Sequence, residues 1–358
     1  MLPTAQHFVS STHQALDGLR RDATQLAKQA MLRSGLVPRP LYLQVDITDA
    51  CNFRCPTCSK WRTAPVRKEL TLEEWATALE RLEALVARRR MSISGGEPFE
   101  RADLLPFLRL AKQHGMYIVL ITNGWSLTRE VLDKLRQIGV DRLHVSLNHL
   151  DADTHDRTRA KPGSQARILQ AIEDWQKVPP GMDLCLATVV SQANCGELVA
   201  LTRYAVERGL TGLLFQVLAP VEVHYAFAEH RQMPPIAAGG GQGDPNWVRD
   251  LDTLRRQMAE VLRLQAAGAP VLNPPFQLRR FVPYYENPQS VLKYPCVGTL
   301  SRLYVDPYGD MRLCYGFPPI GNVLRDDPKR AWYSQQARII RQESRKCTQL
   351  CRLLNNNL

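Results

Sequence analysis

Three closely spaced cysteines are the residues of this chain best suited to chemistry. Cys51, Cys55 and Cys58 follow an apolar run with the spacing C-x3-C-x2-C. Thiolates are the standard ligands of iron–sulfur clusters, so three that close can ligate three irons of a 4Fe–4S cube. No fourth cysteine or histidine lies nearby, and an open coordination position is the mark of a catalytic metal site. Structural zinc needs four protein ligands and a disulfide would leave one thiol over, so the triplet favours a catalytic iron–sulfur site.

A glycine-rich turn follows one strand–helix unit later. Gly95-Gly96-Glu97-Pro98 ends a predicted strand, and glycines let the backbone approach a ligand closely because they lack Cβ. The Glu97 carboxylate could hold an ammonium group. With the cysteine triplet before it, this turn resembles the radical S-adenosylmethionine (SAM) superfamily, in which the amine and carboxylate of SAM chelate the open iron. The resemblance implies that Gly95, Gly96 and Glu97 bind the methionyl amine of SAM.

Polar residues after later strands match the SAM pocket of the same superfamily. The segment His155-Asp156-Arg157-Thr158-Arg159 resembles the family's His-Asp-x-x-Arg, which implies that the Arg159 guanidinium holds the SAM carboxylate. Asn148 stands where the family usually has aspartate, and Thr57 stands where an aromatic residue often contacts adenine. Taken singly, each of these residues would pass for an ordinary loop residue. The resemblance assigns to the SAM pocket Gly95, Gly96, Glu97, Asn123, Ser146, Asn148, Arg159 and Asn194.

A second group of cysteines, Cys296, Cys314, Cys347 and Cys351, lies near the C-terminus. The segment from Tyr304 to Cys314 predicts a β-hairpin, because turn signals lie between β-type flanks. Its G-x4-C and the C-x3-C of the tail resemble the Twitch domain, a short form of the SPASM extension of radical SAM enzymes. The resemblance implies an auxiliary 4Fe–4S cluster without an open iron. Four cysteines suit structural zinc equally well, so zinc is the alternative.

Composition is that of a globular protein without a membrane segment. Of the 358 residues 44% are hydrophobic and 23% charged, and no run reaches the ~18 apolar residues of a transmembrane helix. The first residues lack the pattern of a secretory signal, and nine cysteines in such a chain indicate a reducing compartment, so we expect a cytoplasmic protein. The net charge of +11 comes from basic residues scattered among acids, which argues against nucleic-acid binding. It suits docking of an acidic electron donor of the flavodoxin or ferredoxin type.

Alternating strand and helix patterns predict an α/β protein. Regular βα alternation implies a parallel sheet with helices outside it, and the resemblance makes this a partial (β/α)6 barrel of TIM type. In such barrels the reactive groups sit at the carboxyl ends of the strands, where the motifs above fall. We expect strands at 41–47, 91–94, 117–121, 141–147, 183–190 and 212–218, and helices at 70–87, 102–114, 127–138, 164–177 and 195–208. Thr71 and Glu74 have the spacing of a capping box at the start of the helix at 70–87.

Four segments divide the chain. An N-terminal helical extension (1–39, with a helix at 13–33) precedes the radical SAM partial barrel (40–232). A loop and linker helix (233–285) follows, in which residues 233–245 are rich in glycine and proline and a helix begins near Trp247. A small α+β Twitch/SPASM-type domain for the auxiliary cluster (286–358) ends the chain.

Three residues at the predicted barrel mouth are candidates for catalysis. Cys195 opens a helix there and could donate a hydrogen atom to a substrate radical, although packing is the simpler explanation. Glu222 and His224 follow the sixth strand and could serve as acid and base or contact the substrate. An extended surface strand explains these two residues about as well.

The resemblance also implies a reaction, with SAM and two 4Fe–4S clusters as cofactors. One electron from the first cluster would cleave SAM to methionine and a 5′-deoxyadenosyl radical, which abstracts hydrogen from an unactivated C–H bond. With an auxiliary cluster to take an electron, we expect net oxidation of a small-molecule precursor of a natural product or cofactor. Cross-linking or epimerisation of a ribosomally made peptide is the alternative. A non-catalytic iron–sulfur or zinc protein is the alternative from a different class.

Overall fold

The computed structural model describes residues 37–58, 60–62, 67–219, 241, 243–294 and 296–351. The helix predicted at 13–33, the candidates Glu222 and His224, and most of the loop at 233–245 lie outside these described residues. Within the described ranges, no helix is both long enough and apolar enough to cross a membrane.

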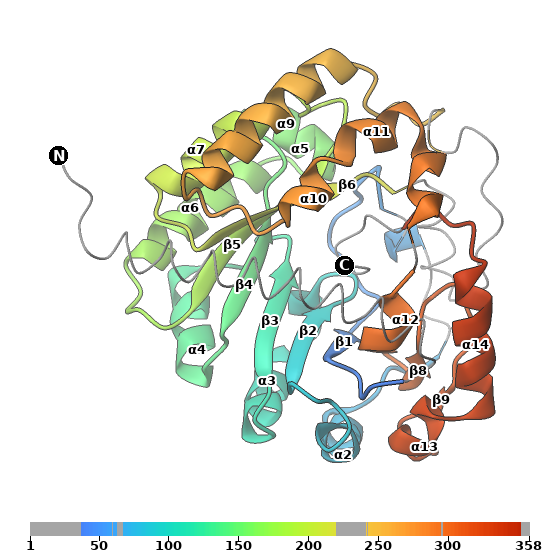
Figure 1. The fold of residues 1–358 in the computed structure, drawn as a ribbon. Helices are drawn as coiled ribbons and strands as arrows, with labels where there is room; N and C mark the ends of the chain where they lie inside the picture. The colour runs from blue at the N-terminus through green and yellow to red at the C-terminus, as the bar shows by residue number, and fades with distance from the viewer. Residues whose placement is uncertain are drawn as a thin grey trace.

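A nine-stranded sheet organises the fold, and its first six strands form a parallel half barrel (Figure 1). The strand order is β6-β5-β4-β3-β2-β1-β7-β8-β9, so neighbours in this half barrel are also neighbours in sequence. Each of the six predicted strands is present, with its ends within one residue of the expected positions. The strands are β1 Tyr42–Asp46, β2 Arg90–Ser94, β3 Tyr117–Thr122, β4 Arg142–Ser146, β5 Asp183–Val190 and β6 Gly212–Val217.

The two faces of the half barrel differ in polarity. On β1 and just after it, Leu43, Val45 and Ile47 are fully buried in the hydrophobic core. The alternate residues Gln44 and Asp46 point to the opposite face, where both contact the hydroxyl of Ser94 on β2. Because side chains alternate across a strand, the apolar side chains of β1 face the helix layer and its polar side chains lie on the other face of the sheet.

Helices cover the apolar face of this sheet. The capping box predicted at Thr71 and Glu74 is confirmed, with each side chain accepting from the other residue's amide. Trp75 and Phe107 pack edge to face with ring centres 5.3 Å apart and join two of these helices. The helices of this layer are α2 Leu72–Glu83, α3 Leu104–Gln113, α4 Arg129–Ile138, α6 Ser164–Gln176 and α7 Leu198–Glu207. Three shorter elements lie in the connections after β1, β2 and β4: η1 Lys60–Arg62, η2 Pro98–Glu100 and α5 Ala152–Arg159.

Helix α5 is not predicted from the sequence, which suggests a loop at this position. All of its residues except Ala152 are polar or charged, so no apolar stripe marks the segment as a helix, and only His155 is buried. Asp151 caps its first turn by accepting from the Thr154 amide at 2.9 Å. The helix places Arg159, its last residue, one turn from His155 and on the same side.

The C-terminal region continues the same sheet. Strand β7 pairs in parallel with β1, where Tyr304 lies opposite Gln44, and the predicted hairpin is confirmed by the antiparallel pair β7–β8. Figure 1 shows α13 and α14 beside β8 and β9. Helix α9 begins at Leu251 rather than near Trp247, because Asp250 caps its first turn by accepting from the Thr253 amide at 3.0 Å. Trp247 precedes the helix and is buried against Tyr284 and Tyr285. The elements are α9 Leu251–Ala266, α10 Pro275–Leu278, α11 Phe281–Glu286, η3 Pro288–Lys293, α12 Gly298–Ser301, β7 Arg302–Val305, β8 Asp310–Arg312, β9 Gly321–Asn322, α13 Pro328–Trp332 and α14 Gln335–Arg345.

Candidate active site

The loop that carries the three cysteines starts at the carboxyl end of β1 and is clamped to the turn after β2. The amide of Gly96 donates to the Thr48 carbonyl and that of Glu97 to the Ala50 carbonyl, both at 2.8 Å. A Cβ added at Gly95 would lie 2.3 Å from the Thr48 oxygen, and one at Gly96 would lie 2.0 Å from the Ala50 oxygen. Only glycine permits this approach. The glycine pair therefore lies against the cysteine loop itself, and its contact with the SAM amine stays a prediction.

The Glu97 carboxylate lies behind this clamp, with only 2% of the residue exposed. Oε1 accepts from the Thr122 hydroxyl at 2.7 Å and the Phe99 amide at 3.3 Å, and Oε2 accepts from the Asn123 amide at 2.7 Å. Burial raises the pKa of Glu97, and these hydrogen bonds oppose the shift. Since a carboxylate offers about four acceptor positions, room for one further donor remains.

Arg159 lies against the cysteine loop. Its carbonyl accepts from Cys55 Sγ at 3.4 Å, and its guanidinium lies 5.7 Å from the centre of the Phe53 ring. Burial raises the pKa of both Cys58 and Glu97, and the charge of Arg159 opposes these shifts. Arg159 Nε is buried and has no hydrogen-bond partner among the described residues. A cationic donor and a carboxylate acceptor thus stand beside the cysteines, which fits the amino-acid part of SAM.

Asn123 and Ser146 lie at the strand ends where the sequence places them. Asn123 Nδ2 donates to Asn52 Oδ1 at 2.8 Å, and Asn52 directly follows Cys51. This side chain therefore connects the end of β3 to the cysteine loop. Ser146 is the last residue of β4 and is partly buried. Contact of either residue with SAM stays a prediction.

Asn148 and Asn194 tie the ends of β4 and β5 together. Asn194 Nδ2 donates to the carbonyls of Asn148 and Val189 at 2.8 and 2.9 Å, and its Oδ1 accepts from the Ser191 amide at 2.7 Å. Asn148 Oδ1 accepts from the Val189 amide at 3.2 Å, while its Nδ2 donates to the Thr158 hydroxyl at 3.2 Å. Both side chains are thus engaged within the protein, and they hold the rim of the predicted pocket in shape.

The three loop thiols influence one another. Burial, with the negative charge of Cys55, Glu97 and Cys58, raises the pKa of Cys51 to about 11. The amide of Cys58 donates to the Cys55 carbonyl at 3.1 Å, which closes a tight turn between them. Metal ligation requires thiolates, and a bound cation compensates the repulsion among them. The donor set therefore fits an iron–sulfur cluster.

The four C-terminal cysteines also gather at one place. Burial, with the negative charge of Cys296 and Cys347, raises the pKa of Cys314 to about 12. The pKa of Cys351 is raised by burial and then by the other three cysteines. All nine cysteines of the chain carry thiols. In the part of the chain that the structure describes, no three His, Cys, Asp or Glu side chains converge tightly enough to hold a single metal ion.

Cys195 lies in the turn before α7 and is only 4% exposed. Its Sγ lies 3.7 Å from the Gln192 carbonyl oxygen, to which the thiol donates. Burial raises the pKa of this thiol. The surroundings of Cys195 fit a packed side chain, which is the simpler of the two explanations given by the sequence.

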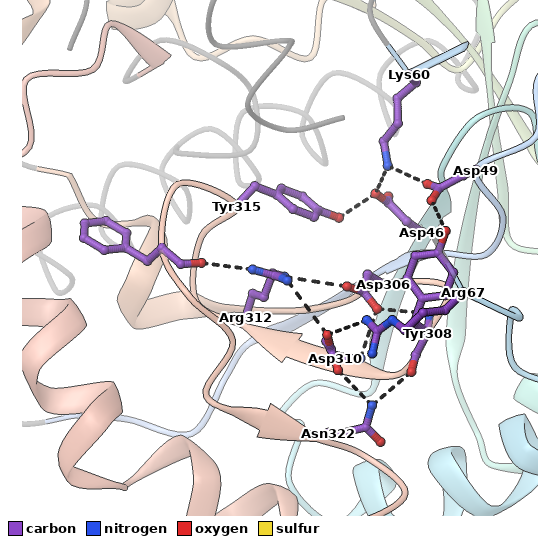
Figure 2. Close-up of polar contacts among 11 residues, drawn as sticks. Asp46, Asp49, Lys60, Arg67, Asp306, Tyr308, Asp310, Arg312, Tyr315 and Asn322 are labelled. Carbon is purple, nitrogen blue, oxygen red and sulfur yellow. Dashed lines mark hydrogen bonds and ion pairs between the residues drawn. The ribbon is translucent and has the colours of Figure 1, made fainter. Parts of the chain in front are cut away.

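A buried polar cluster beside the cysteine loop is missed by sequence reasoning (Figure 2). Lys60 Nζ donates to Asp46 Oδ2 at 2.9 Å and to Asp49 Oδ1 at 3.1 Å. The Tyr315 hydroxyl donates to Asp46 at 2.6 Å, and the Tyr308 hydroxyl donates to Asp49 at 2.8 Å. These tyrosine–aspartate pairs are 269 and 259 residues apart in sequence, so no local pattern predicts them.

Two family profiles match the chain in separate regions. The Radical SAM superfamily profile matches residues 45–187, and the SPASM iron–sulfur cluster-binding domain profile matches residues 296–353. The chain is 34% identical over 300 residues to an AdoMet-dependent heme synthase of Methanosarcina barkeri, which covers 81% of each protein. It is 32% identical to a PqqA peptide cyclase of Ruegeria pomeroyi over 48% of this chain and 46% of that protein. It is 31% identical to a probable GTP 3′,8-cyclase of Thermococcus kodakarensis over 51% of this chain and 58% of that protein.

Solved structures share the fold. A crystal structure of Streptococcus suis SuiB bound to S-adenosylmethionine matches with a TM-score of 0.65 over 87% of this chain and 70% of that chain, at 15% identity. Native anSMEcpe with bound AdoMet and a Cp18Cys peptide matches with a TM-score of 0.62 over 86% of this chain and 84% of that chain, at 14% identity. The sequence matches and the shared fold lead to one conclusion. The chain belongs to the radical SAM superfamily, carries a C-terminal SPASM iron–sulfur cluster-binding domain, and uses SAM and 4Fe–4S clusters as cofactors.

Proposed function

We propose that this chain is a radical SAM oxidoreductase that removes hydrogen from a small-molecule precursor. The supporting observation is that the cysteine loop, an acceptor position on Glu97 and a donor on Arg159 meet at the carboxyl ends of the strands. In this proposal the SAM-binding cluster is ligated by Cys51, Cys55 and Cys58. The auxiliary cluster is ligated by Cys296, Cys314, Cys347 and Cys351.

Each part of the site has a task in this proposal. When bound, the reduced cluster and SAM supply a 5′-deoxyadenosyl radical that abstracts a hydrogen atom from the substrate. Glu97 accepts a hydrogen bond from the SAM ammonium group, and Arg159 donates to the SAM carboxylate. Gly95 and Gly96 fix the cysteine loop by their close contact with it. Phe53, buried within the loop, excludes water from the cysteines.

Similarity over most of the chain favours a cofactor precursor as substrate. The relative that covers 81% of both proteins is named for heme synthesis, so a precursor of heme or a related cofactor is the first candidate. The peptide cyclase and the nucleotide cyclase each match only about half of the chain at nearly equal identity. That half therefore does not discriminate a peptide from a small molecule. A precursor peptide is the second candidate, because the chain shares its fold with SuiB, whose structure with the peptide SuiA is known.

Net oxidation is the proposed outcome. The four C-terminal cysteines would hold the group that accepts the substrate electron, and Glu222 and His224 remain candidates for acid–base work or substrate contact. An acidic flavodoxin- or ferredoxin-type protein would deliver electrons to a chain whose net charge is +11.

Product analysis under anaerobic conditions tests this function. We expect reconstituted protein, SAM, a reductant and a heme precursor to give 5′-deoxyadenosine and a product lighter by the hydrogens removed, with one SAM consumed per hydrogen abstraction. A product that has the mass of the substrate in ordinary water, and that gains one deuterium in heavy water, would instead establish epimerisation. Failure to form product with any heme precursor or precursor peptide would refute both proposed substrate classes.

A further inference from the structure

The buried cluster of Figure 2 joins the two cysteine-bearing parts of the molecule. On one side are Asp46, Asp49 and Lys60, which flank the loop of three cysteines. On the other side are Tyr308, in the β7–β8 turn, and Tyr315, which directly follows Cys314. The two aspartates and the two tyrosines are each at most 8% exposed.

On the loop side, the ion pairs close the cysteine loop at both of its ends. Asp46 and Asp49 precede Cys51, whereas Lys60 follows Cys58, and the Lys60 ammonium contacts both carboxylates. The ammonium therefore links the start and the end of the loop.

On the C-terminal side, a rigid turn presents the Tyr308 hydroxyl. Asp306 Oδ1 accepts from the amides of Tyr308 and Asp310, both at 3.0 Å. Asn322 Nδ2 donates to the Tyr308 carbonyl and to Asp310 Oδ1, both at 2.9 Å. Arg67 donates to Asp310 Oδ2 at 2.7 Å and lies 4.8 Å from the centre of the Tyr308 ring. The tyrosine is thus held from several directions while its hydroxyl points at Asp49.

Tyr315 is held in a comparable way. Its ring packs 4.8 Å from the ring of Tyr304, and its hydroxyl donates to the same Asp46 oxygen that Lys60 contacts. Ser94 on β2 donates to the other Asp46 oxygen at 3.0 Å. The orientation of the Asp46 carboxylate therefore depends on β2, on the cysteine loop and on the residue next to Cys314.

Simple docking of the two regions would not require this arrangement. Burying charges is costly, and apolar side chains of similar size dock surfaces at least as well. Hydrogen bonds from two phenols and one ammonium instead fix the two carboxylates in direction, and each such bond to a charged group is among the stronger ones in proteins. The cluster therefore specifies geometry at the ends of the loop.

We propose that Tyr308 and Tyr315 are positioning residues for the SAM site. They act through Asp46, Asp49 and Lys60 to fix the loop of three cysteines. In this way the C-terminal domain sets the geometry at which SAM binds. This inference rests on the ligand sets given under the proposed function. Its effect on the loop backbone can nevertheless be measured whether or not a substrate is known.

Tyr308→Phe and Tyr315→Phe test the proposal in anaerobically prepared holoenzyme, with Tyr304→Phe as matched control. Tyr304 lies in the same aromatic pair, and in the described part of the chain its hydroxyl donates to neither aspartate. Hydrogen–deuterium exchange of residues 50–58 and 60–62, SAM affinity, and the EPR spectrum of the reduced protein with and without SAM are measured.

Loss of one hydrogen bond to a buried carboxylate is expected to speed exchange in the loop and weaken SAM binding by about tenfold each. The EPR change on SAM addition should differ from that of the wild type, while the iron content stays the same. Tyr304→Phe should match the wild type in all three measurements.

Two results would overturn the proposal. In the first, Tyr308→Phe and Tyr315→Phe show the same hydrogen–deuterium exchange in the loop, the same SAM affinity and the same EPR change on SAM addition as Tyr304→Phe. The other is a lower melting temperature with unchanged exchange and EPR behaviour, since that is what a purely structural role predicts. Wild-type protein that binds no SAM would refute the proposed function, and the exchange comparison would then still decide the present inference.

Discussion

Replacing Gly96 by alanine should separate the cysteine loop from β2. The added Cβ would lie 2.0 Å from the Ala50 carbonyl oxygen, 2.6 Å from its carbon and 2.8 Å from the Asp49 oxygen, so the two backbones must move apart. This movement breaks the hydrogen bonds from Gly96 to Thr48 and from Glu97 to Ala50, worth about 1 kcal/mol each. With an overpacking cost of about 1–3 kcal/mol, the free energy of unfolding should fall by about 3–5 kcal/mol.

That loss is smaller than the stability of a typical domain, about 5–15 kcal/mol, so the chain should still fold. We expect the variant to lose the SAM-binding cluster and to keep the auxiliary one, which leaves about half of the iron. Urea unfolding and iron analysis of anaerobically prepared protein measure both effects. Gly196→Ala is the control, because its Cβ meets only a methyl group of Thr253 at 3.5 Å. Full iron content and SAM cleavage in Gly96→Ala would refute the argument that this contact holds the loop.

Three further predictions concern the rest of the site. Arg159→Ala, and to a lesser degree Glu97→Gln, should weaken SAM binding by about ten- to hundredfold at unchanged iron content, because each removes a charge partner of SAM. If equilibrium dialysis gave wild-type SAM affinity for both variants, the pocket would lie elsewhere. Cys314→Ala should still release 5′-deoxyadenosine in product assays but form little oxidised product, whereas Cys195→Ala should form nearly as much product as the wild type. Loss of product in Cys195→Ala, with solvent deuterium in the product only when Cys195 is present, would favour epimerisation. Asn194→Ala should lower the free energy of unfolding by about 2–4 kcal/mol in urea titrations, because two buried carbonyls lose their donor; a loss below about 1 kcal/mol would show that these ties between β4 and β5 contribute little.

The parts of the fold that local sequence determines were predictable. Strand limits, the capping box at Thr71 and Glu74, and the hairpin after Tyr304 follow from residue alternation, side-chain capping and turn residues, and the structure confirms them. Helix α5 was missed because all of its residues except Ala152 are polar or charged, so its sequence lacks a helical apolar pattern. The pairing of β7 with β1 joins residues 260 positions apart, such as Tyr42 and Arg302, which no local pattern reports.

The candidate site was predictable in composition but not in its contacts. Cysteine spacing grouped the loop thiols, and the family resemblance grouped the four C-terminal thiols. In the structure the thiols of each group lie near enough to raise one another's pKa, and their roles as cluster ligands stay predictions. The sequence predicts that Gly96 contacts a ligand, and that contact stays a prediction. The packing of Gly96 against the Ala50 carbonyl, which leaves no room for a Cβ, was not predicted. Neither Lys60 nor Tyr315 belongs to a sequence motif, so neither was predicted. Their importance comes from a shared contact with Asp46, which only the structure shows.

Iron and zinc analysis of anaerobically prepared protein, combined with a SAM cleavage assay, tests the central claim most directly. Seven ligand cysteines in a three-plus-four arrangement should hold two cubes, or ~8 Fe per chain, without stoichiometric zinc. The variant with Cys51, Cys55 and Cys58 replaced by alanine should retain ~4 Fe and release no 5′-deoxyadenosine. Stoichiometric zinc in the wild type, or SAM cleavage that survives in the triple variant, would contradict the account.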